Sequence, residues 1–148
     1  AMPVRAQQAQ ASLKAALLYR FVQYSEWSDN PPAQQHYCIA RDNGVFNALT
    51  EILGQQAKVV LLTEAHQATP CTVLYLSAEL ASKPAWSQLL QTQRQLTVVE
   101  GAELFRQGAM FGLIAEPHRI SFRVNLTLAR QQGFHLSAQM LKLAKEIH

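Results

Sequence analysis

Short apolar segments alternate with helical segments through the middle of the chain, and this alternation constrains the fold more than any other feature. Four of these segments have the length of β-strands and are bounded by turn or helix residues: 36–40, 58–63, 71–77 and 95–99. Residues 58–63 and 71–77 lack polar alternation, which is typical of strands covered on both faces of a parallel sheet. Helical spacing is seen over 45–53, and Pro84 opens another short helix. The pattern therefore predicts an α/β fold, a Rossmann-like, mostly parallel sheet flanked by helices.

A long helix is expected before this region, over residues 6–27. Two apolar stripes run along it at helical spacing, formed by Leu13, Leu17, Phe21 and Tyr24 and, alongside, by Ala15, Leu18 and Val22. Together they cover more than the ~100° of one core contact, so the helix is expected to touch its own domain on one side and another surface on the other. Phe21 and Tyr24 are expected in the core. The Pro31-Pro32 pair ends the helix.

The last third of the chain follows a different pattern. Residues 108–115 predict a strand, 116–118 a tight turn, and 119–126 a second strand with alternating side chains. Its apolar positions are Ile120, Phe122, Val124 and Leu126, and its polar positions are Arg119, Ser121, Arg123 and Asn125. We therefore expect a C-terminal antiparallel hairpin with one face in solvent. A helix over 127–132 and a last helix, capped by Ser137 and containing Leu141 and Leu143, follow it.

Length and composition favour one folded domain. The chain has 148 residues, of which 49% are hydrophobic and 16% charged, and this excludes a disordered chain. No apolar run approaches the ~20 residues of a membrane-spanning helix, and a net charge of +3 is too weak to indicate nucleic-acid binding. We interpret residues 1–5 as a cloning remnant (Ala1-Met2) and mature N-terminus, and 6–148 as the single domain. No secretory leader is visible, and its absence says nothing about export.

Patterns of catalytic, metal and cofactor sites are absent from the sequence. The glycines form no phosphate-binding loop, and the five histidines lack the spacing of a zinc site. The glutamates are spread one per element, and neither cysteine lies beside a base or at a helix N-terminus. We therefore expect no catalytic residues, no metal and no cofactor. An enzyme stays a rival hypothesis that convergent acid–base groups in a deep cleft would revive.

The two cysteines leave two alternatives open. Cys38 lies inside the first strand and Cys71 begins the third, and these strands are neighbours if the sheet has the order 2-1-3. A disulfide would close a loop of 33 residues and stabilise the fold by about 3.7 kcal/mol in the chain-entropy estimate. Two buried thiols in a cytosolic protein are an equally ordinary outcome.

Two sets of side chains are candidates for surface contacts. Tyr19 and Trp27 are the aromatic residues of the first helix expected at the surface, and Tyr and Trp are favoured at protein interfaces. On the hairpin, Arg119, Arg123 and Asn125 share the polar face. That face is either simply solvated or contacts an anionic ligand or a protein.

Both ends of the chain resemble the YfiR-like family. Residues 14–27 (KAALLYRFVQYSEW) are similar to the opening K-A-A-x-L-Y-x-F-x-x-[FY]-x-x-W pattern of that family. Near the other end, GAMF (108–111), RISFRVNL (119–126), GFHLS (133–137) and LKLA (141–144) resemble its closing motifs. The order and spacing match over essentially the whole chain. Ala109 replaces a glycine of the pattern, and Arg123 stands where the family often has an acidic residue.

This resemblance implies a function that the spacing does not show. YfiR-like proteins are small periplasmic α/β proteins that form homodimers. The best-known members bind and repress the periplasmic sensor domain of an inner-membrane diguanylate cyclase, and an outer-membrane, peptidoglycan-binding lipoprotein sequesters them. They thereby control cyclic-di-GMP signalling and biofilm formation.

For individual residues, the resemblance implies the following. It favours the Cys38–Cys71 disulfide, whereas the second cysteine pair of some members is missing here, which puts a redox switch based on that pair in doubt. The expected partner- or ligand-binding residues are Phe111, Arg119, Phe122, Arg123, Asn125 and His135. Tyr19 and Trp27 are expected at the dimer interface. The alternative function is a periplasmic sensory module that binds a small molecule.

Overall fold

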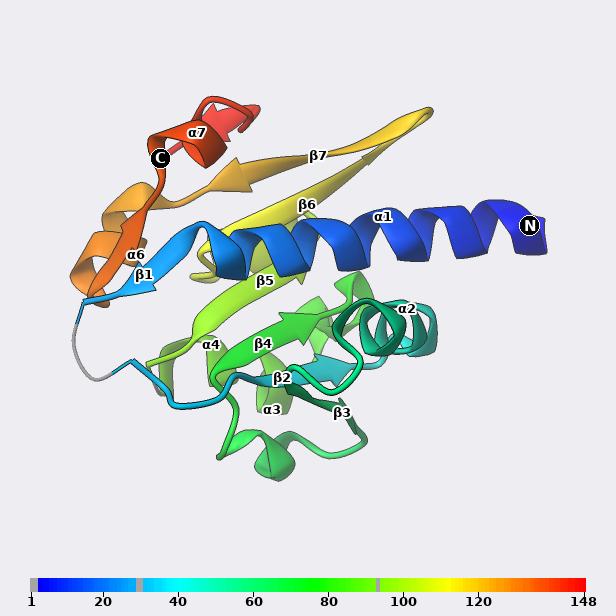
Figure 1. The fold of residues 1–148 in the computed structure, drawn as a ribbon, viewed down its shortest axis with the longest axis horizontal. Coiled ribbons are helices and arrows are strands. Elements are labelled where there is room, and N and C mark those ends of the chain that lie inside the picture. The colour runs from blue at the N-terminus through cyan, green and yellow to red at the C-terminus, as the bar shows by residue number, and fades with distance from the viewer. Residues whose placement is uncertain (1–2, 29–30, 93) are drawn as a thin grey trace.

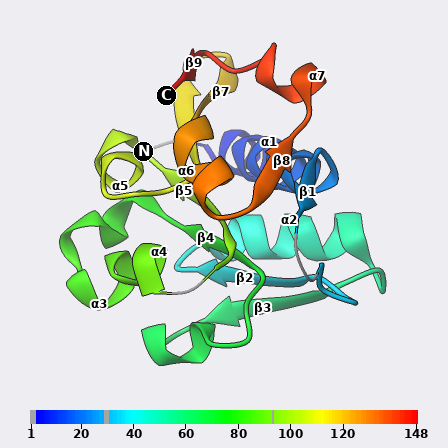
Figure 2. The same cartoon turned by 90° about the vertical axis from the view of Figure 1, so that its left-hand side faces the viewer.

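A computed structural model describes residues 3–28, 31–92 and 94–148 of the chain. The expected cloning remnant, Ala1-Met2, lies outside the described residues. A seven-stranded sheet forms the centre of the molecule, and helices lie on both of its faces (Figures 1 and 2).

The large sheet has the strand order β3-β2-β4-β5-β6-β7-β9. Its strands are β2 (His36–Ala40), β3 (Lys58–Leu62), β4 (Val73–Leu76), β5 (Leu96–Glu100), β6 (Phe111–Glu116), β7 (Arg119–Val124) and β9 (Glu146–Ile147). The pairs from β3 to β6 are parallel, β7 runs antiparallel to β6, and β9 runs parallel to β7. This topology confirms the expected α/β fold with a C-terminal hairpin. A separate antiparallel pair joins β1 (Ser25–Trp27) to β8 (Phe134–Leu136).

Helices cover the two faces unequally. The α-helices are α1 (Val4–Gln23), α2 (Asn43–Leu53), α3 (Pro84–Ser87), α4 (Leu89–Thr92), α5 (Ala102–Arg106), α6 (Leu126–Gln131) and α7 (Ala138–Leu141). Two 3-10 helices, η1 (Ala65–Ala68) and η2 (Ala78–Ser82), lie in the connections on either side of β4. Figure 2 shows α1 and α2 on one side of the sheet and α3, α4 and α5 on the other.

Two apolar cores follow from the alternation of side chains along the strands. Tyr37 and Ile39 of β2 belong to the core beneath α1 and α2, together with Leu18 and Phe21 of α1. The intervening Cys38 belongs to the core on the opposite face. Because every other residue of a strand points to the same side, one apolar run supplies both cores, as expected for a sheet covered on both faces.

Cys38 and Cys71 form a disulfide in the structure, with their Cα atoms 5.8 Å apart. Cys38 lies in β2, and Cys71 lies two residues before β4, which pairs with β2. Both cysteines are buried. The bridge therefore ties neighbouring parallel strands together from the side of the sheet opposite α1.

The first helix is shorter than expected, because it ends at Gln23 and residues 25–27 form β1. The Ser25 hydroxyl donates to the Phe21 carbonyl at 2.5 Å, and Ser25 and Trp27 then pair with Leu136 and Phe134 of β8. The prediction of a helix to residue 27 was wrong because a distant strand supplies better partners for this backbone than another helical turn.

Two burial predictions and one helix prediction also differ from the structure. Tyr24, expected in the core, is 40% exposed, because the chain turns out of the helix at this residue. The strand 58–63, expected to be covered, lies at the edge of the sheet as β3 and is only half-buried. Leu143, expected in the last helix, lies beyond α7 and is 68% exposed.

Candidate functional site

The β6–β7 hairpin presents two faces of opposite character. Phe111 and Phe122 point into the core, where both rings contact Phe21 of α1 at centroid distances of 4.2 and 4.9 Å. The exposed fractions of Phe111 and Phe122 are 0% and 4%. These two predicted contact residues therefore attach the hairpin to α1 and present no side chain to a partner in this structure.

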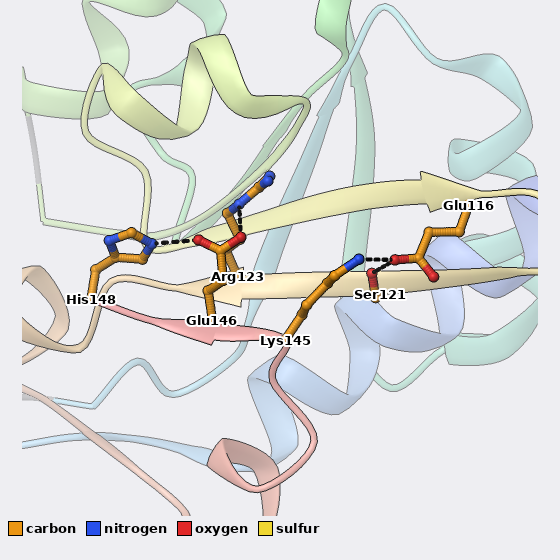
Figure 3. A network of polar contacts seen from close by, with 6 residues as sticks. All are labelled: Glu116, Ser121, Arg123, Lys145, Glu146 and His148. Atoms are coloured by element: carbon orange, nitrogen blue, oxygen red, sulfur yellow. Dashed lines mark hydrogen bonds and ion pairs between the residues drawn. The ribbon is translucent and has the colours of Figure 1, made fainter.

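A polar network on the other face links the hairpin to the C-terminal strand β9 (Figure 3). Arg123 Nε lies 3.0 Å from Glu146 Oε2, directly across the β7–β9 pair. His148 Nε2 lies 3.1 Å from the other oxygen of the same carboxylate. Hydrogen bonds from the His148 and Arg123 side chains lower the pKa of Glu146.

Glu116 is the centre of the second half of the network. Its carboxylate accepts hydrogen bonds from Lys145, from Arg119 at 2.7 Å and from the Ser121 hydroxyl at 2.9 Å. These bonds, with Lys145 the largest contributor, lower the pKa of Glu116 to about 2. Arg119 is thus placed near the hairpin turn, on the same strand as Arg123 but in a separate cluster of charges.

A cleft opens beside Arg123, between β9 and α5. It has a volume of about 340 Å³, and its lining residues are Ala102, Phe105, Arg106, Arg123, Asn125, Glu146 and His148. The His148 ring packs edge-on against Phe105 at 5.4 Å. Two guanidinium groups border this cleft, and each already has an acidic partner, Glu146 for Arg123 and Glu103 for Arg106 at 2.8 Å. A carboxylate of a partner can bind here by sharing or exchanging these ion pairs.

The other two predicted contact residues lie in different places. Asn125 borders the cleft, but its side-chain oxygen accepts from the Leu128 N–H at 3.0 Å and caps α6. His135 is exposed on β8 opposite Glu26, in the small sheet and not in the hairpin. The structure therefore brings Arg123 and Asn125 together and separates His135 from both.

Tyr19 and Trp27 do not share one element. Tyr19 lies in α1, where its hydroxyl accepts from Gln23 Nε2 at 2.8 Å. Trp27 lies in β1 and packs edge-on against Phe134 at 4.9 Å. Both side chains are half-buried, and their role in a dimer stays a prediction.

A small apolar groove that the sequence patterns did not locate lies between α1 and α7. Its volume is about 80 Å³, and it is lined by Leu17, Arg20, Phe21, Tyr24, Phe122, Gln139, Met140 and Leu143. Leu143 and Tyr24 are among the most exposed large apolar residues of the described chain. Leu17, Phe21 and Tyr24 of this groove belong to the first of the two predicted stripes. The second stripe, Ala15, Leu18 and Val22, is buried in the core and does not line it.

A further group of acid–base side chains converges at the carboxyl ends of β4 and β5. The buried Tyr75 hydroxyl lies 3.1 Å from Asp42 Oδ2 and 3.3 Å from Glu100 Oε2, and Lys14 of α1 pairs with Glu100. Burial, followed by the charge of Glu100, raises the pKa of Tyr75 well above its usual value. These four groups are paired with one another, so they fasten α1 to the sheet.

The residues that the structure describes hold neither a metal-binding cluster nor a membrane-spanning helix. Within them, no group of three or more His, Cys, Asp or Glu side chains is placed to hold a metal ion. None of their helices combines the length and hydropathy that crossing a membrane requires.

Three comparisons relate the chain to known proteins. A family model described as YfiR/HmsC-like matches residues 11–145. No curated protein sequence matches. One similar solved structure is an ABC domain from Streptococcus pneumoniae in complex with L-Trp, with 9% identity and a TM-score of 0.62 over 96% of this chain and 62% of that one.

A second similar structure is a conserved domain protein from Vibrio cholerae O1 biovar El Tor strain N16961. It is 13% identical, with a TM-score of 0.62 over 93% of this chain and 60% of that one. The chain thus spans about three fifths of each of these proteins. At these identities the two structures establish the fold alone.

Proposed function

Because the chain belongs to the YfiR/HmsC-like family, we propose that it is a non-catalytic periplasmic regulator that represses an inner-membrane diguanylate cyclase by binding its periplasmic sensor domain. The observation that carries this proposal is the family match over residues 11–145, which includes both α1 and the C-terminal hairpin. The cellular output would be a lower level of cyclic-di-GMP and less biofilm. An outer-membrane, peptidoglycan-binding lipoprotein is the proposed second partner, and a homodimer the proposed assembly.

Repression of this kind is a shift between two states of the cyclase. A bound regulator lowers the active fraction only if its affinity for the inactive state of the sensor domain is higher than for the active state. We place the contact at the cleft beside Arg123, since Arg123 and Arg106 border it and their ion pairs, with Glu146 and Glu103, are partly or largely exposed and can exchange for a partner's carboxylate. A carboxylate of the sensor domain is the complementary group.

Reconstitution of the cyclase tests the proposal. The full-length cyclase is placed in vesicles with its sensor domain facing the added regulator, and cyclic-di-GMP synthesis is measured against regulator concentration. The expected result is saturable inhibition, with binding to the isolated sensor domain at the same concentrations by calorimetry. Absence of both binding and inhibition would contradict the proposal.

A small-molecule sensor is the second candidate, and the groove between α1 and α7 favours it. The groove is apolar with Arg20 at its border, which suits an apolar group beside a carboxylate, and its volume of about 80 Å³ would enclose only part of such a ligand. The structurally similar ABC domain was solved with L-Trp, so this amino acid is the first ligand to test. A concentration-dependent rise in Tm with L-Trp, lost in Leu143→Asp, would favour the sensor. No rise with a panel of amino acids would favour the protein-binding regulator.

A further inference from the structure

The two edges of the large sheet are built in opposite ways. At one edge, β9 has two residues, both exposed, and its Glu146, together with Lys145 just before the strand, carries charge into the network of Figure 3. At the other edge, β3 has the sequence KVVLL, and Val59, Val60 and Leu61 are half-buried. Natural edge strands avoid pairing with other chains by being short, charged, bulged or proline-containing, and β9 follows this rule whereas β3 does not.

Backbone N–H and C=O groups on the outer side of β3 are directed away from the sheet. Lys58 N–H donates inward to the Gln35 carbonyl at 3.2 Å, on the β2 side. Since successive residues of a strand direct their backbone groups to alternate sides, Val60 and Leu62 also face β2, and Val59 and Leu61 face outward. Within residues 3–28, 31–92 and 94–148, no strand pairs with this edge, and no hydrogen bond to the backbone of Val59 or Leu61 is found.

We propose that β3 is a self-association edge, at which two copies of the chain pair their β3 strands antiparallel about a two-fold axis at Val60. In this register Val59 of one copy lies opposite Leu61 of the second. Both are outward-facing residues, so each such pair exchanges two N–H···O bonds, and the two Val60 side chains meet in the closer, non-hydrogen-bonded position. The two large sheets then continue into one another.

Charge complementarity favours a second copy of the chain as the partner that pairs with β3. In this register Lys58 lies opposite Leu62 of the second copy, so the two lysines are at opposite ends of the paired strands and do not repel. Glu64, two residues beyond Leu62 and exposed, is the N-cap of η1, where its side chain forms a capping box with Gln67. Its carboxylate also becomes the diagonal neighbour of Lys58 on the other chain. Symmetry repeats this Lys58–Glu64 pair. Ile52 of α2, 37% exposed and on the helix that packs beside β3, extends the apolar contact.

Sedimentation velocity of the purified chain over a hundredfold range of concentration tests the proposal. The wild type is expected to dimerise. Val59→Pro removes the outward N–H but leaves the bonds to β2, because a proline is tolerated where its missing N–H faces away from the sheet. It is expected to raise the dimer dissociation constant at least ~100-fold while the Tm of the monomer stays within a few degrees. A monomeric wild type, or a folded Val59→Pro that dimerises like the wild type, overturns the proposal.

Charge variants at the exposed positions decide the question if Val59→Pro does not fold. Lys58→Glu and Glu64→Lys are each expected to weaken the dimer about tenfold, since each places like charges in two symmetric contacts. The double variant Lys58→Glu/Glu64→Lys restores the attraction and is expected to recover the affinity. Lys83→Glu, with the same charge change at a residue between η2 and α3 and outside β3 and η1, serves as the control. If the double variant is no better than the singles, the register is wrong.

A dimer that forms through Tyr19 and Trp27, the dimer interface expected from the sequence, would respond to different substitutions. If Trp27→Ala dissociates the dimer and the β3 variants do not, self-association uses that face and the β3 proposal fails. The test needs no cyclase, so its result is independent of the repression proposed above.

Discussion

Phe21 of α1 stacks on Phe111 of β6, with ring centroids 4.2 Å apart and ring planes 6° from parallel. This contact joins the first helix to the first strand of the C-terminal hairpin. Phe122 of β7 approaches the same ring edge-on, so Phe21 holds both strands of the hairpin. The two segments that resemble the opening and closing motifs of the family are thus parts of one packing unit.

Phe21→Ala is therefore expected to lower the free energy of unfolding by about 3–5 kcal/mol, because the ring is buried and leaves a cavity. Urea unfolding followed by circular dichroism measures this loss. Phe21→Leu keeps most of the apolar volume and should cost less than half as much. Leu13→Ala on the same helix is the matched control, since Leu13 is 48% exposed and its loss should change the free energy by no more than about 0.5 kcal/mol. Equal effects of Phe21→Ala and Leu13→Ala would contradict this account.

The central sheet was predictable because local patterns determine it. Each apolar run between turns became a strand, and the parallel order around Cys38 follows from the short helical crossovers between the runs. The alternation along residues 119–126 likewise predicted the inward side chains of β7. In these elements, the sequence pattern itself indicates which side chains are buried.

The parts that were missed depend on distant partners. Residues 25–27 form a strand only because β8 lies beside them, and the two residues of β9 are too few to give a pattern. The charge of Arg123 was read as free for a partner, whereas Glu146 from the C-terminal strand already pairs with it. No spacing rule connects those two positions, so the network in Figure 3 needed the structure.

Arg123→Ala is expected to weaken binding of the cyclase sensor domain without much change in Tm. The side chain forms a partly exposed ion pair, and such pairs contribute at most about 1 kcal/mol to stability, whereas a guanidinium that binds a partner carboxylate contributes more to affinity. Calorimetry with the isolated sensor domain should show a dissociation constant raised at least ~10-fold. Arg130→Ala, an exposed arginine of α6 outside the cleft, should bind like the wild type. Unchanged affinity of Arg123→Ala would remove the cleft from the proposed interface.

Glu116 gives the hairpin a predicted pH dependence. Its pKa is lowered to about 2 in the folded chain from an ordinary value of 4.5, so its contribution to stability is complete above about pH 4.5 and is lost as the pH falls through 2. Glu116→Gln cannot ionise and lacks this contribution. The Tm of the wild type should exceed that of Glu116→Gln at pH 7, and the difference should shrink between pH 4.5 and 2. Added salt should reduce the difference as well, because the network is near the surface.

Glu79→Gln serves as the control for this titration, since Glu79 is exposed in η2 and outside the network. Its Tm should follow that of the wild type at every pH. If Glu116→Gln also follows the wild type from pH 7 to pH 2, then Lys145 and Arg119 do not stabilise the ionised carboxylate as the structure indicates.

The Cys38–Cys71 disulfide is expected to stabilise the fold without taking part in partner binding. It closes a loop with a sequence separation of 33, which corresponds to about 3.7 kcal/mol in the chain-entropy estimate. Cys38→Ala/Cys71→Ala should lose an amount of this order in urea unfolding. Wild type that is reduced in denaturant and refolded with reductant should have the same free energy of unfolding as the double variant. Reductant should leave the free energy of unfolding of the double variant unchanged. Because the bridge joins β2 to the start of β4 and touches neither β7 nor β9, the folded double variant should bind the sensor domain with wild-type affinity. A loss of affinity in the folded variant, with little loss of stability, would instead make this disulfide a redox switch.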